Sequence, residues 1–341
     1  MSNATEAMQA EWCPDVVIYH GPGCMDGFAA AWACWRKWGD DGGEKAPYKT
    51  GPVYVPMQYG GALPDIEGKR VLMVDYSLKR PAMIEAAKLA KSIVVLDHHK
   101  SAEKEFGNQE GALRGHWLDQ DDFGLSLVCC SMPTIDLVDY WLSADHHGDD
   151  VDLSTLSWVH KLFVGFDMSK SGARLAWEFC HPGEPMPRLL EHIEDRDLFR
   201  HALRLTEEIS KALHSYPATF HAFDNWVMGS GLARLEHEGI PILRHHTKLV
   251  AELCSNAYME EVAGHTVPVL NCPGQYASDC GNKLLELHPD APFAATWARK
   301  GNGVEAWSLR SRKGGTNVAE IAATLGGGGH PAAAGFSRVA P

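Results

Sequence analysis

The sequence predicts an α/β protein whose N-terminal part contains a parallel sheet. Three strand-like apolar runs, at residues 16–20, 71–75 and 93–97, each lead to a carboxylate or an imidazole. Segments with helical periodicity follow at residues 27–35 and 81–90. This alternation of strands and helices indicates a parallel sheet with right-handed crossovers. Because ligands of such sheets bind beyond the carboxyl ends of the strands, the three polar strand ends are expected to converge there.

The N-terminal part contains two predicted strand–helix units. The first strand is apolar and rich in β-branched residues, and the helix expected at 27–35 places Phe28, Trp32 and Trp35 on one face. The second helix has Pro81 in its expected first turn, where the missing N–H of proline has no intrahelical partner to lose. Both units therefore end their strands at the same predicted edge of the sheet.

The pattern is interrupted at residues 106–165, which mix polar and aromatic residues without a clear period. We interpret this segment as an insertion or a lid. Helical patterning returns at residues 171–179 and 189–199. A long amphipathic stretch at 231–262 is expected to form a helix that links two domains.

A second, smaller α/β domain is predicted after this helix. It comprises a strand at 267–271, a helix at 278–287, a hairpin of 293–297 and 305–310, and a capped helix at 316–325. The predicted division is 12–230 for the first domain, 231–261 for the linker and 262–341 for the second domain. The ligand is expected in the cleft between the domains.

The charge of the chain restricts its partners. The 341 residues carry a formal net charge of −13, with 31 Lys and Arg against 44 Asp and Glu. Binding to duplex nucleic acid depends on clustered basic residues, so we do not expect a duplex partner. A small phosphorylated or nucleotide substrate, bound by a few basic residues, is compatible with this charge. A short single-stranded nucleic acid is compatible with it as well. A homodimer is also compatible with the sequence.

Cysteine usage and the N-terminus predict a cytoplasmic protein. The nine cysteines are scattered and form no C-x-x-C pair. The first 14 residues lack the basic and apolar regions of a secretory signal, and no apolar run has the length of a membrane span. We therefore expect neither disulfides nor a membrane partner.

The polar residues at the predicted strand ends are of the types that bind divalent cations. His20 ends the first strand and Asp26 follows it, Asp75 ends the second, and His98 follows the third. Carboxylate oxygens together with imidazole nitrogens suit metal ions that activate water. The sequence therefore predicts a metal site at this edge of the sheet.

Four motifs in order resemble the DHH phosphoesterase superfamily with its DHH-associated C-terminal domain. They are His20-x-x-x-Cys24-x-Asp26-Gly27, Asp75, Asp97-His98-His99, and Gly326-Gly327-Gly328-Gly329-His330. The resemblance covers most of the chain except about 106–165. A second tripeptide, Asp145-His146-His147, follows no apolar strand and is expected to be a solvated loop.

The resemblance implies two divalent ions, most often Mn²⁺, with Mg²⁺, Zn²⁺ and Fe²⁺ as alternatives. His20 and Cys24 would hold one ion, Asp26 and His98 the other, and Asp75 would bridge them. A later family motif has an Asp four residues before a Phe, which favours Asp195 over Asp197 as a further ligand because Phe199 follows.

Cys24 departs from the family, which commonly has aspartate at this position. A thiolate is a softer ligand and would shift the preference towards zinc or iron. The alternative is that Cys24 is a small loop residue beside a centre that retains one ion. Next to the ligands, His99 is expected to contact the phosphate or protonate the leaving group, and Asp97 to orient an imidazole.

The second domain carries the predicted substrate grip. Backbone N–H groups of Gly327, Gly328 and Gly329 could bond phosphate or base edges, with His330 adjacent. Arg310 and Ser311 match an Arg-Ser pair that the family places against phosphate. Arg310 belongs to a basic cluster, whose other members are Arg299, Lys300, Arg312 and Lys313. The alternatives are a helix C-cap for the glycine run and a solvated face for the cluster's lysines, Lys300 and Lys313.

The predicted function is metal-dependent hydrolysis of phosphodiester bonds in short oligonucleotides or cyclic mono- or dinucleotides, by a metal-activated hydroxide. The family also contains nano-RNases, exopolyphosphatases and pyrophosphatases, so an exopolyphosphatase or pyrophosphatase is the first alternative. The second is a nucleotide-binding regulator that has lost catalysis, which Cys24 and the unusual insertion would explain.

Overall fold

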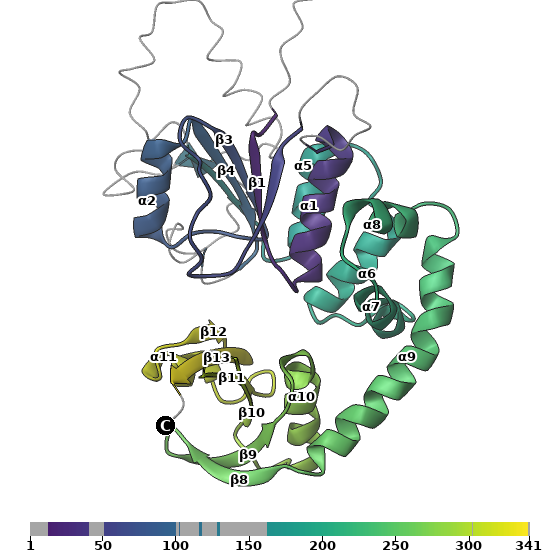
Figure 1. Cartoon of the computed structure of the whole chain (residues 1–341), viewed down its shortest axis with the longest axis vertical. Coiled ribbons are helices and arrows are strands. Elements are labelled where there is room, and N and C mark those ends of the chain that lie inside the picture. The colour runs from purple at the N-terminus through teal and green to yellow at the C-terminus, as the bar shows by residue number, and fades with distance from the viewer. Residues whose placement is uncertain are drawn as a thin grey trace, which may run out of the picture. The chain divides into compact units, whose positions relative to one another are not determined.

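The computed structural model of the chain describes residues 13–40, 51–99, 102, 116–117, 128–129, 162–301 and 303–339. The chain forms two compact units, Met1–Gly239 and Ile240–Pro341, each an α/β arrangement with its own sheet (Figure 1). The predicted fold class is therefore confirmed for both parts. Among the described residues, no helix is long and apolar enough to cross a membrane.

The sheet of the first unit has five parallel strands and two short antiparallel ones. Its strand order is β2-β1-β3-β4-β7-β5-β6. The strands are β1 (Val16–His20), β2 (Val53–Met57), β3 (Arg70–Val74), β4 (Ser92–Asp97), β5 (His116–Trp117), β6 (Val128–Cys129) and β7 (Leu162–Phe166).

The three predicted strands are the central ones, because they are apolar on both faces. Ile18, Met73 and Val95 are fully buried in one hydrophobic cluster. The edge strand β2 escaped prediction because it contains Pro56 and is largely exposed, so it lacks an apolar run. Central parallel strands can thus be predicted from their apolar runs, whereas this edge strand cannot.

The predicted insertion at 106–165 extends too far, because its last residues belong to strand β7. Residues 162–165 belong to this strand, which pairs in parallel with β4 and is part of the core sheet. Leu162 and Val164 pack into the central hydrophobic cluster. Apart from the short strands β5 and β6, the rest of the segment lies outside the described residues, as does Asp145-His146-His147.

Helices cover both faces of this sheet. Helix α2 packs Met83 and Ala86 on one face, and α1 and α5 lie together on the other (Figure 1). Trp32 of α1 stacks on Trp177 of α5, with ring centroids 5.9 Å apart. The helices of this unit are α1 (Met25–Trp38), α2 (Arg80–Leu89), α5 (Gly172–Cys180), α6 (Arg188–Asp197), α7 (Thr206–His214) and α8 (Phe220–Val227).

The second unit contains a six-stranded mixed sheet of order β12-β13-β11-β10-β9-β8. Helix α10 packs Leu284 against Leu270 on one face, and α11 packs Val318 and Ala322 against Val269 on the other. Its strands are β8 (Tyr258–Val262), β9 (His265–Asn271), β10 (Ala294–Arg299), β11 (Val304–Arg310), β12 (Gly328–His330) and β13 (Ala333–Val339), and its helices are α10 (Ala277–Leu287) and α11 (Val318–Thr324).

The long helix expected at 231–262 is shorter than predicted. Helix α9 spans Gly231–Cys254, across the boundary of the two units, and residues 258–262 form β8 instead. Ala263 and Gly264 both have positive φ, which closes β8 and β9 into a tight antiparallel hairpin. This turn, rather than local propensity, makes the segment a strand.

Candidate metal centre

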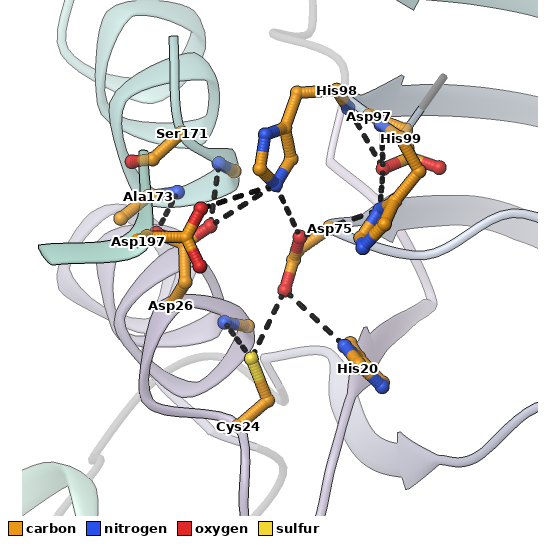
Figure 2. Close-up of polar contacts among 12 residues, drawn as sticks. His20, Cys24, Asp26, Asp75, Asp97, His98, His99, Ser171, Ala173 and Asp197 are labelled. Atoms are coloured by element: carbon orange, nitrogen blue, oxygen red, sulfur yellow. Dashed lines mark hydrogen bonds and ion pairs between the residues drawn. The ribbon is translucent and has the colours of Figure 1, made fainter. Parts of the chain in front are cut away.

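Asp75 lies at the centre of the polar cluster in the first unit, immediately after β3. Its backbone is left-handed, with φ of 53°, and its N–H donates to the Leu96 carbonyl at 2.9 Å. The side chain is 1% exposed, and its two oxygens face different partners (Figure 2). Oδ1 is 3.1 Å from His98 Nε2, whereas Oδ2 is 3.4 Å from Cys24 Sγ and 3.6 Å from His20 Nδ1.

The first cluster of potential ligands consists of His20, Cys24 and Asp75. Cys24 caps α1, because its sulfur accepts the Gly27 N–H at 3.4 Å while its thiol donates to Asp75. Burial, together with the charges of Asp75 and Asp26, raises the pKa of this thiol well above its usual value. Without a cation beside it, Cys24 is therefore a neutral thiol.

The second cluster consists of Asp26, His98 and Asp197. Asp26 accepts the backbone N–H groups of Gly172 and Ala173 at 2.7 and 3.1 Å, so the N-terminus of α5 holds its carboxylate. Oδ2 of Asp26 and Oδ2 of Asp197 lie 3.6 and 3.5 Å from His98 Nε2. Three carboxylates, counting Asp75, thus surround one imidazole nitrogen.

The pKa values of the second cluster indicate that its carboxylates have too little positive charge around them. Burial, Asp197 and Asp75 raise the pKa of Asp26, and burial raises that of Asp197. Burial alone would lower the pKa of His98, but its contact with Asp75 and the charge of Asp26 raise it to about 10. The His98 imidazolium is therefore a substitute for a cation between the carboxylates.

These residues fit a divalent metal ion. Nδ1 of His20 is buried and has no hydrogen-bond partner in the described part of the chain, although Asp75 is nearby. Each cluster offers three ligand atoms that all lie within 4.8 Å of one another. The two clusters share His and carboxylate chemistry but differ in the Cys24 sulfur, so they would differ in metal preference.

Asp97 and His99 form a pair beside the two clusters, and His99 also forms a third group of potential ligands with Asp75 and His98. Asp97 is fully buried, and its Oδ1 accepts the His98 backbone N–H at 2.7 Å and contacts His99 Nδ1 at 2.6 Å. His99 Nδ1 is also 3.8 Å from Asp75 Oδ1. Burial would lower the pKa of His99, but the hydrogen bond to Asp97 and the charges of Asp97 and Asp75 together raise it. His99 is thus held in one orientation next to the centre.

Two glycines let the backbone approach the centre closely. A Cβ on Gly27 would lie 2.2 Å from the His20 carbonyl oxygen, and one on Gly172 would lie 2.4 Å from the Asp75 Cβ. Neither position can accept a side chain without a shift of backbone or ligands. The prediction included Gly27 as part of a motif, but nothing in the sequence singled out Gly172.

The structure reverses the predicted choice between Asp195 and Asp197. Asp195 turns away from the clusters and accepts the N–H groups of Ala202 and Leu203 at 2.8 and 3.1 Å, and the Thr206 hydroxyl at 2.7 Å. Burial would raise its pKa, but these hydrogen bonds lower it. Asp195 therefore organises the connection between α6 and α7, and the ligand prediction for it was wrong.

Asp197 and Asp195 lie on different faces of α6. Asp197 is four residues after Ile193, so the two share a face of α6, and both line a cavity next to Cys24 and Asp26. Asp195 is on a different face, which packs against the start of α7. The spacing to Phe199 was the misleading signal, because it relied on the resemblance rather than on the geometry of the helix.

The residues predicted to bind substrate lie in the second unit, where they have contacts of their own. Arg310 ends β11, and its guanidinium donates to Ser278 Oγ at 3.3 Å and to the Leu309 carbonyl at 2.9 Å. Ser311 is buried and its hydroxyl donates to the Pro292 carbonyl at 3.5 Å. Their substrate role stays a prediction.

The glycine run begins where α11 ends, and β12 (Gly328–His330) follows as an edge strand paired with β13. A Cβ on Gly327 would lie 2.1 Å from the Gly335 carbonyl oxygen, and one on Gly329 would lie 2.6 Å from the Ala334 Cα. Packing within the unit thus requires these two glycines. Gly328 and His330 are exposed, and a Cβ on Gly328 would meet nothing within 4 Å.

Two members of the predicted basic cluster have structural roles. Arg312 donates to the Leu285, His288 and Ala291 carbonyls, which closes the C-terminal end of α10. Arg299 pairs with Glu305 at 3.0 Å. Part of the basic cluster predicted from the sequence is therefore engaged in contacts within the second unit.

Comparison with known proteins gives distant relatives. No family model matches the chain. It is 25% identical over 335 residues to the uncharacterized protein R106 of Acanthamoeba polyphaga mimivirus, covering 95% of this chain and 67% of the relative.

Solved structures similar to 95% of this chain include the pGpG-specific phosphodiesterase PggH from Vibrio cholerae, with 12% identity, a TM-score of 0.43 and 92% of that chain covered. Another is an exopolyphosphatase-related protein from Bacteroides fragilis, with 11% identity, a TM-score of 0.41 and 87% of that chain covered. None of these likenesses assigns a family or a substrate, so the chemistry has to follow from the site.

Proposed function

We propose that this protein hydrolyses phosphodiester bonds with the help of divalent metal ions bound at the two clusters. The observation that carries the proposal is the position of Asp75, whose Oδ2 faces His20 and Cys24 while Oδ1 faces His98. A carboxylate that presents one oxygen to each of two ligand clusters is suited to bridge two ions. Two ions held in this way are typical of centres that act on phosphate esters.

The ligands divide between the clusters, with His20 and Cys24 on one side of Asp75, and Asp26, His98 and Asp197 on the other. The bound metal would activate water and neutralise charge on the phosphate oxygens. The carboxylates and imidazole of the second cluster suit Mn²⁺ or Mg²⁺, whereas the Cys24 sulfur favours Zn²⁺ or Fe²⁺ in the first.

His99 and Asp97 would handle a proton. Asp97 Oδ1 engages His99 Nδ1, so Nε2 is the ring atom from which a proton could pass to the leaving oxygen. The raised pKa of His99 favours its imidazolium form. Asp97 acts by fixing the orientation of the ring.

An additional cationic group supports an anionic substrate. Arg196 precedes Asp197 and lines the cavity beside the second cluster. Its Nε is buried and has no hydrogen-bond partner in the described residues, although it forms an ion pair with Glu207 at 3.7 Å. A phosphate oxygen would satisfy this N–H. Short or cyclic nucleotides are the proposed substrates, because the acidic chain offers only local basic groups of this kind.

The experiment is a turnover panel with Mn²⁺ that compares the wild type with Asp75→Asn. The substrates are a dinucleotide, a cyclic mononucleotide and polyphosphate. We expect diester hydrolysis by the wild type and a loss of at least about a hundredfold in Asp75→Asn, because the bridging ligand is impaired. Asp65→Asn is the control, since the Asp65 side chain is 73% exposed.

Each other outcome has a defined meaning. Turnover of polyphosphate alone would replace the proposal with the exopolyphosphatase alternative. Full activity in Asp75→Asn would remove the bridged two-metal centre. Tight nucleotide binding with no turnover of any substrate would favour a regulator that has lost catalysis, an alternative that the neutral Cys24 thiol keeps open.

A further inference from the structure

A cavity of about 170 Å³ adjoins the second cluster within the first unit. Cys24, Asp26 and Asp197 form the end nearest the potential metal ligands, and side chains of α6 and α7 form the rest. Its apolar walls include Ile193 and Leu213. A cavity of this size is below the range of sites that enclose a drug-sized ligand, so it suits one ring of a larger substrate.

His192 is one of the buried polar residues that line this cavity. The residue is 4% exposed, and its Nδ1 is 2.9 Å from Thr206 Oγ1. The Thr206 hydroxyl has one proton, which it donates to Asp195 at 2.7 Å. Asp195 is an acceptor throughout this site, because its Oδ1 accepts the Ala202 N–H and its Oδ2 accepts the Leu203 N–H as well as the Thr206 hydroxyl, so Thr206 must accept a proton from His192 Nδ1.

This hydrogen-bond chain determines what His192 can bind. With the proton on Nδ1, the Nε2 of the neutral ring carries a lone pair and is an acceptor. Burial lowers the pKa of His192, which keeps the ring neutral. No described residue hydrogen-bonds to Nε2, so this nitrogen is the acceptor that His192 offers to a ligand in the cavity.

We propose that the cavity binds the sugar attached to the scissile phosphate, and that His192 Nε2 accepts a hydrogen bond from a ribose hydroxyl. This inference rests on the proposed phosphodiesterase function. The sugar is one oxygen away from the phosphorus, so the group that lies next to the metal ligands is a sugar rather than a base. Among the described residues, no Phe, Tyr or Trp lines the cavity, and its rings are the imidazoles of His192 and His214. The large aromatic side chains that usually serve as a platform for a base are therefore missing from this lining.

Asp195 and Thr206 are positioning residues for this contact. They hold the proton on Nδ1 and thereby leave Nε2 as an acceptor, which selects a hydroxyl donor. The carboxylate that resembled a metal ligand in the sequence thus serves substrate selection through two hydrogen bonds. If the bonded hydroxyl is the 2′-OH, a protein with this arrangement discriminates RNA from DNA at one sugar.

The experiment compares kcat/KM for a diadenosine dinucleotide and its 2′-deoxy and 3′-deoxy analogues. A site built to bond a hydroxyl rejects the analogue that lacks it, so we expect the wild type to favour the ribonucleotide by about tenfold or more over one of the two analogues. His192→Leu removes the acceptor and should bring that ratio close to one. His192→Gln keeps an acceptor oxygen and should retain most of the preference.

A second measurement separates failure of this inference from failure of the proposed function. Binding of AMP and its 2′-deoxy and 3′-deoxy analogues to the metal-loaded protein is measured by calorimetry, which needs no turnover. Equal binding of the three by the wild type, or an unchanged preference in His192→Leu, overturns the sugar assignment even if diesters are cleaved. A His192-dependent preference among AMP, GMP and CMP would instead place a base in the cavity and also overturn it. His245→Leu, on the exposed surface of α9, is the control.

Discussion

Single protons and single carboxylates determine the charge of the centre. His98 carries a proton because three carboxylates surround its Nε2, and the Cys24 thiol keeps its proton because of burial and the same charges. The balance of positive and negative charge in the centre changes if any one carboxylate is neutralised. Asp197 is the acid at the open side, with 30% of its side chain exposed, whereas Asp26 and Asp75 are almost fully buried.

The pair Asp197→Asn and Asp195→Asn tests which acid binds metal. Substitution of groups that merely support a ligand typically weakens metal binding 10- to 100-fold, so loss of Asp197 itself should weaken Mn²⁺ binding by at least about a hundredfold. Asp195→Asn should leave metal affinity within a few-fold but lower the free energy of unfolding by about 1–3 kcal/mol, because its hydrogen bonds to Ala202, Leu203 and Thr206 weaken.

Titration calorimetry with Mn²⁺ and chemical denaturation measure the two effects. Asp197→Asn should also stabilise the metal-free protein, since it removes a carboxylate that raises the pKa of Asp26. If Asp195→Asn lost metal affinity and Asp197→Asn kept it, the placement of α6 described above would be wrong.

At the scale of elements, the ends of two helices bring the ligands together. Cys24 caps α1 while Asp26 lies in its first turn, and Asp26 in turn is held by the first N–H groups of α5. The positive end of the α5 dipole partly offsets the repulsion that Asp26 experiences from the other acids. Buried Glu194 of α6 pairs with Arg174 of α5 and so keeps these helices in register.

Gly172→Ala tests the close approach of α5. The new Cβ would lie 2.4 Å from the Asp75 Cβ, so α5 or the Asp75 backbone has to move. Overpacking of this kind costs about 1–3 kcal/mol in the free energy of unfolding, and a shift of Asp75 should also weaken metal binding.

The matched control is Gly274→Ala, where a Cβ meets nothing within 4 Å and φ is not positive. Thermal unfolding and Mn²⁺ titration of both variants are the measurements. Wild-type stability and affinity in Gly172→Ala would contradict the contact between α5 and Asp75.

At the scale of the whole molecule, the centre couples metal binding to folding stability and to pH. Without metal, the raised pKa of His98 stabilises the folded state fully below the unfolded value of 6.5, and this contribution is lost as pH rises towards about 10. Metal binding has the opposite dependence, because the ion must displace the His98 proton.

We therefore expect the Mn²⁺-induced rise in Tm to be larger at about pH 8.5 than at about pH 6. Scanning fluorimetry with chelator and with excess Mn²⁺ at both pH values measures the difference, since a ligand stabilises according to its apparent affinity. His98→Gln has no such proton to displace and should lose most of the pH dependence. An equal Mn²⁺ effect at both pH values in the wild type would exclude competition between the proton and the metal.

The predictions from the sequence succeeded where the chain is patterned locally. Strands β1, β3 and β4 are continuous apolar runs, and α11 has Asn317 as its cap, with Oδ1 accepting from Ala319 and Nδ2 donating to Glu320. The predictions failed for segments that are strands because of their pairing with other strands. These are the edge strand β2, β7 inside the supposed insertion, and β8 at the end of the supposed helix.

The sequence by itself determined the fold class and that the side chains at three strand ends would meet, because parallel strands place their carboxyl ends on one edge. Only the tertiary structure decided which acid of Asp195 and Asp197 joins them, since two residues on opposite sides of one helix differ in direction rather than in chemistry. It also decided that Asp26 is held by α5, that Gly172 has no room for a side chain, and that His192 lines a cavity. These depend on contacts between segments far apart in the chain, which no local pattern encodes.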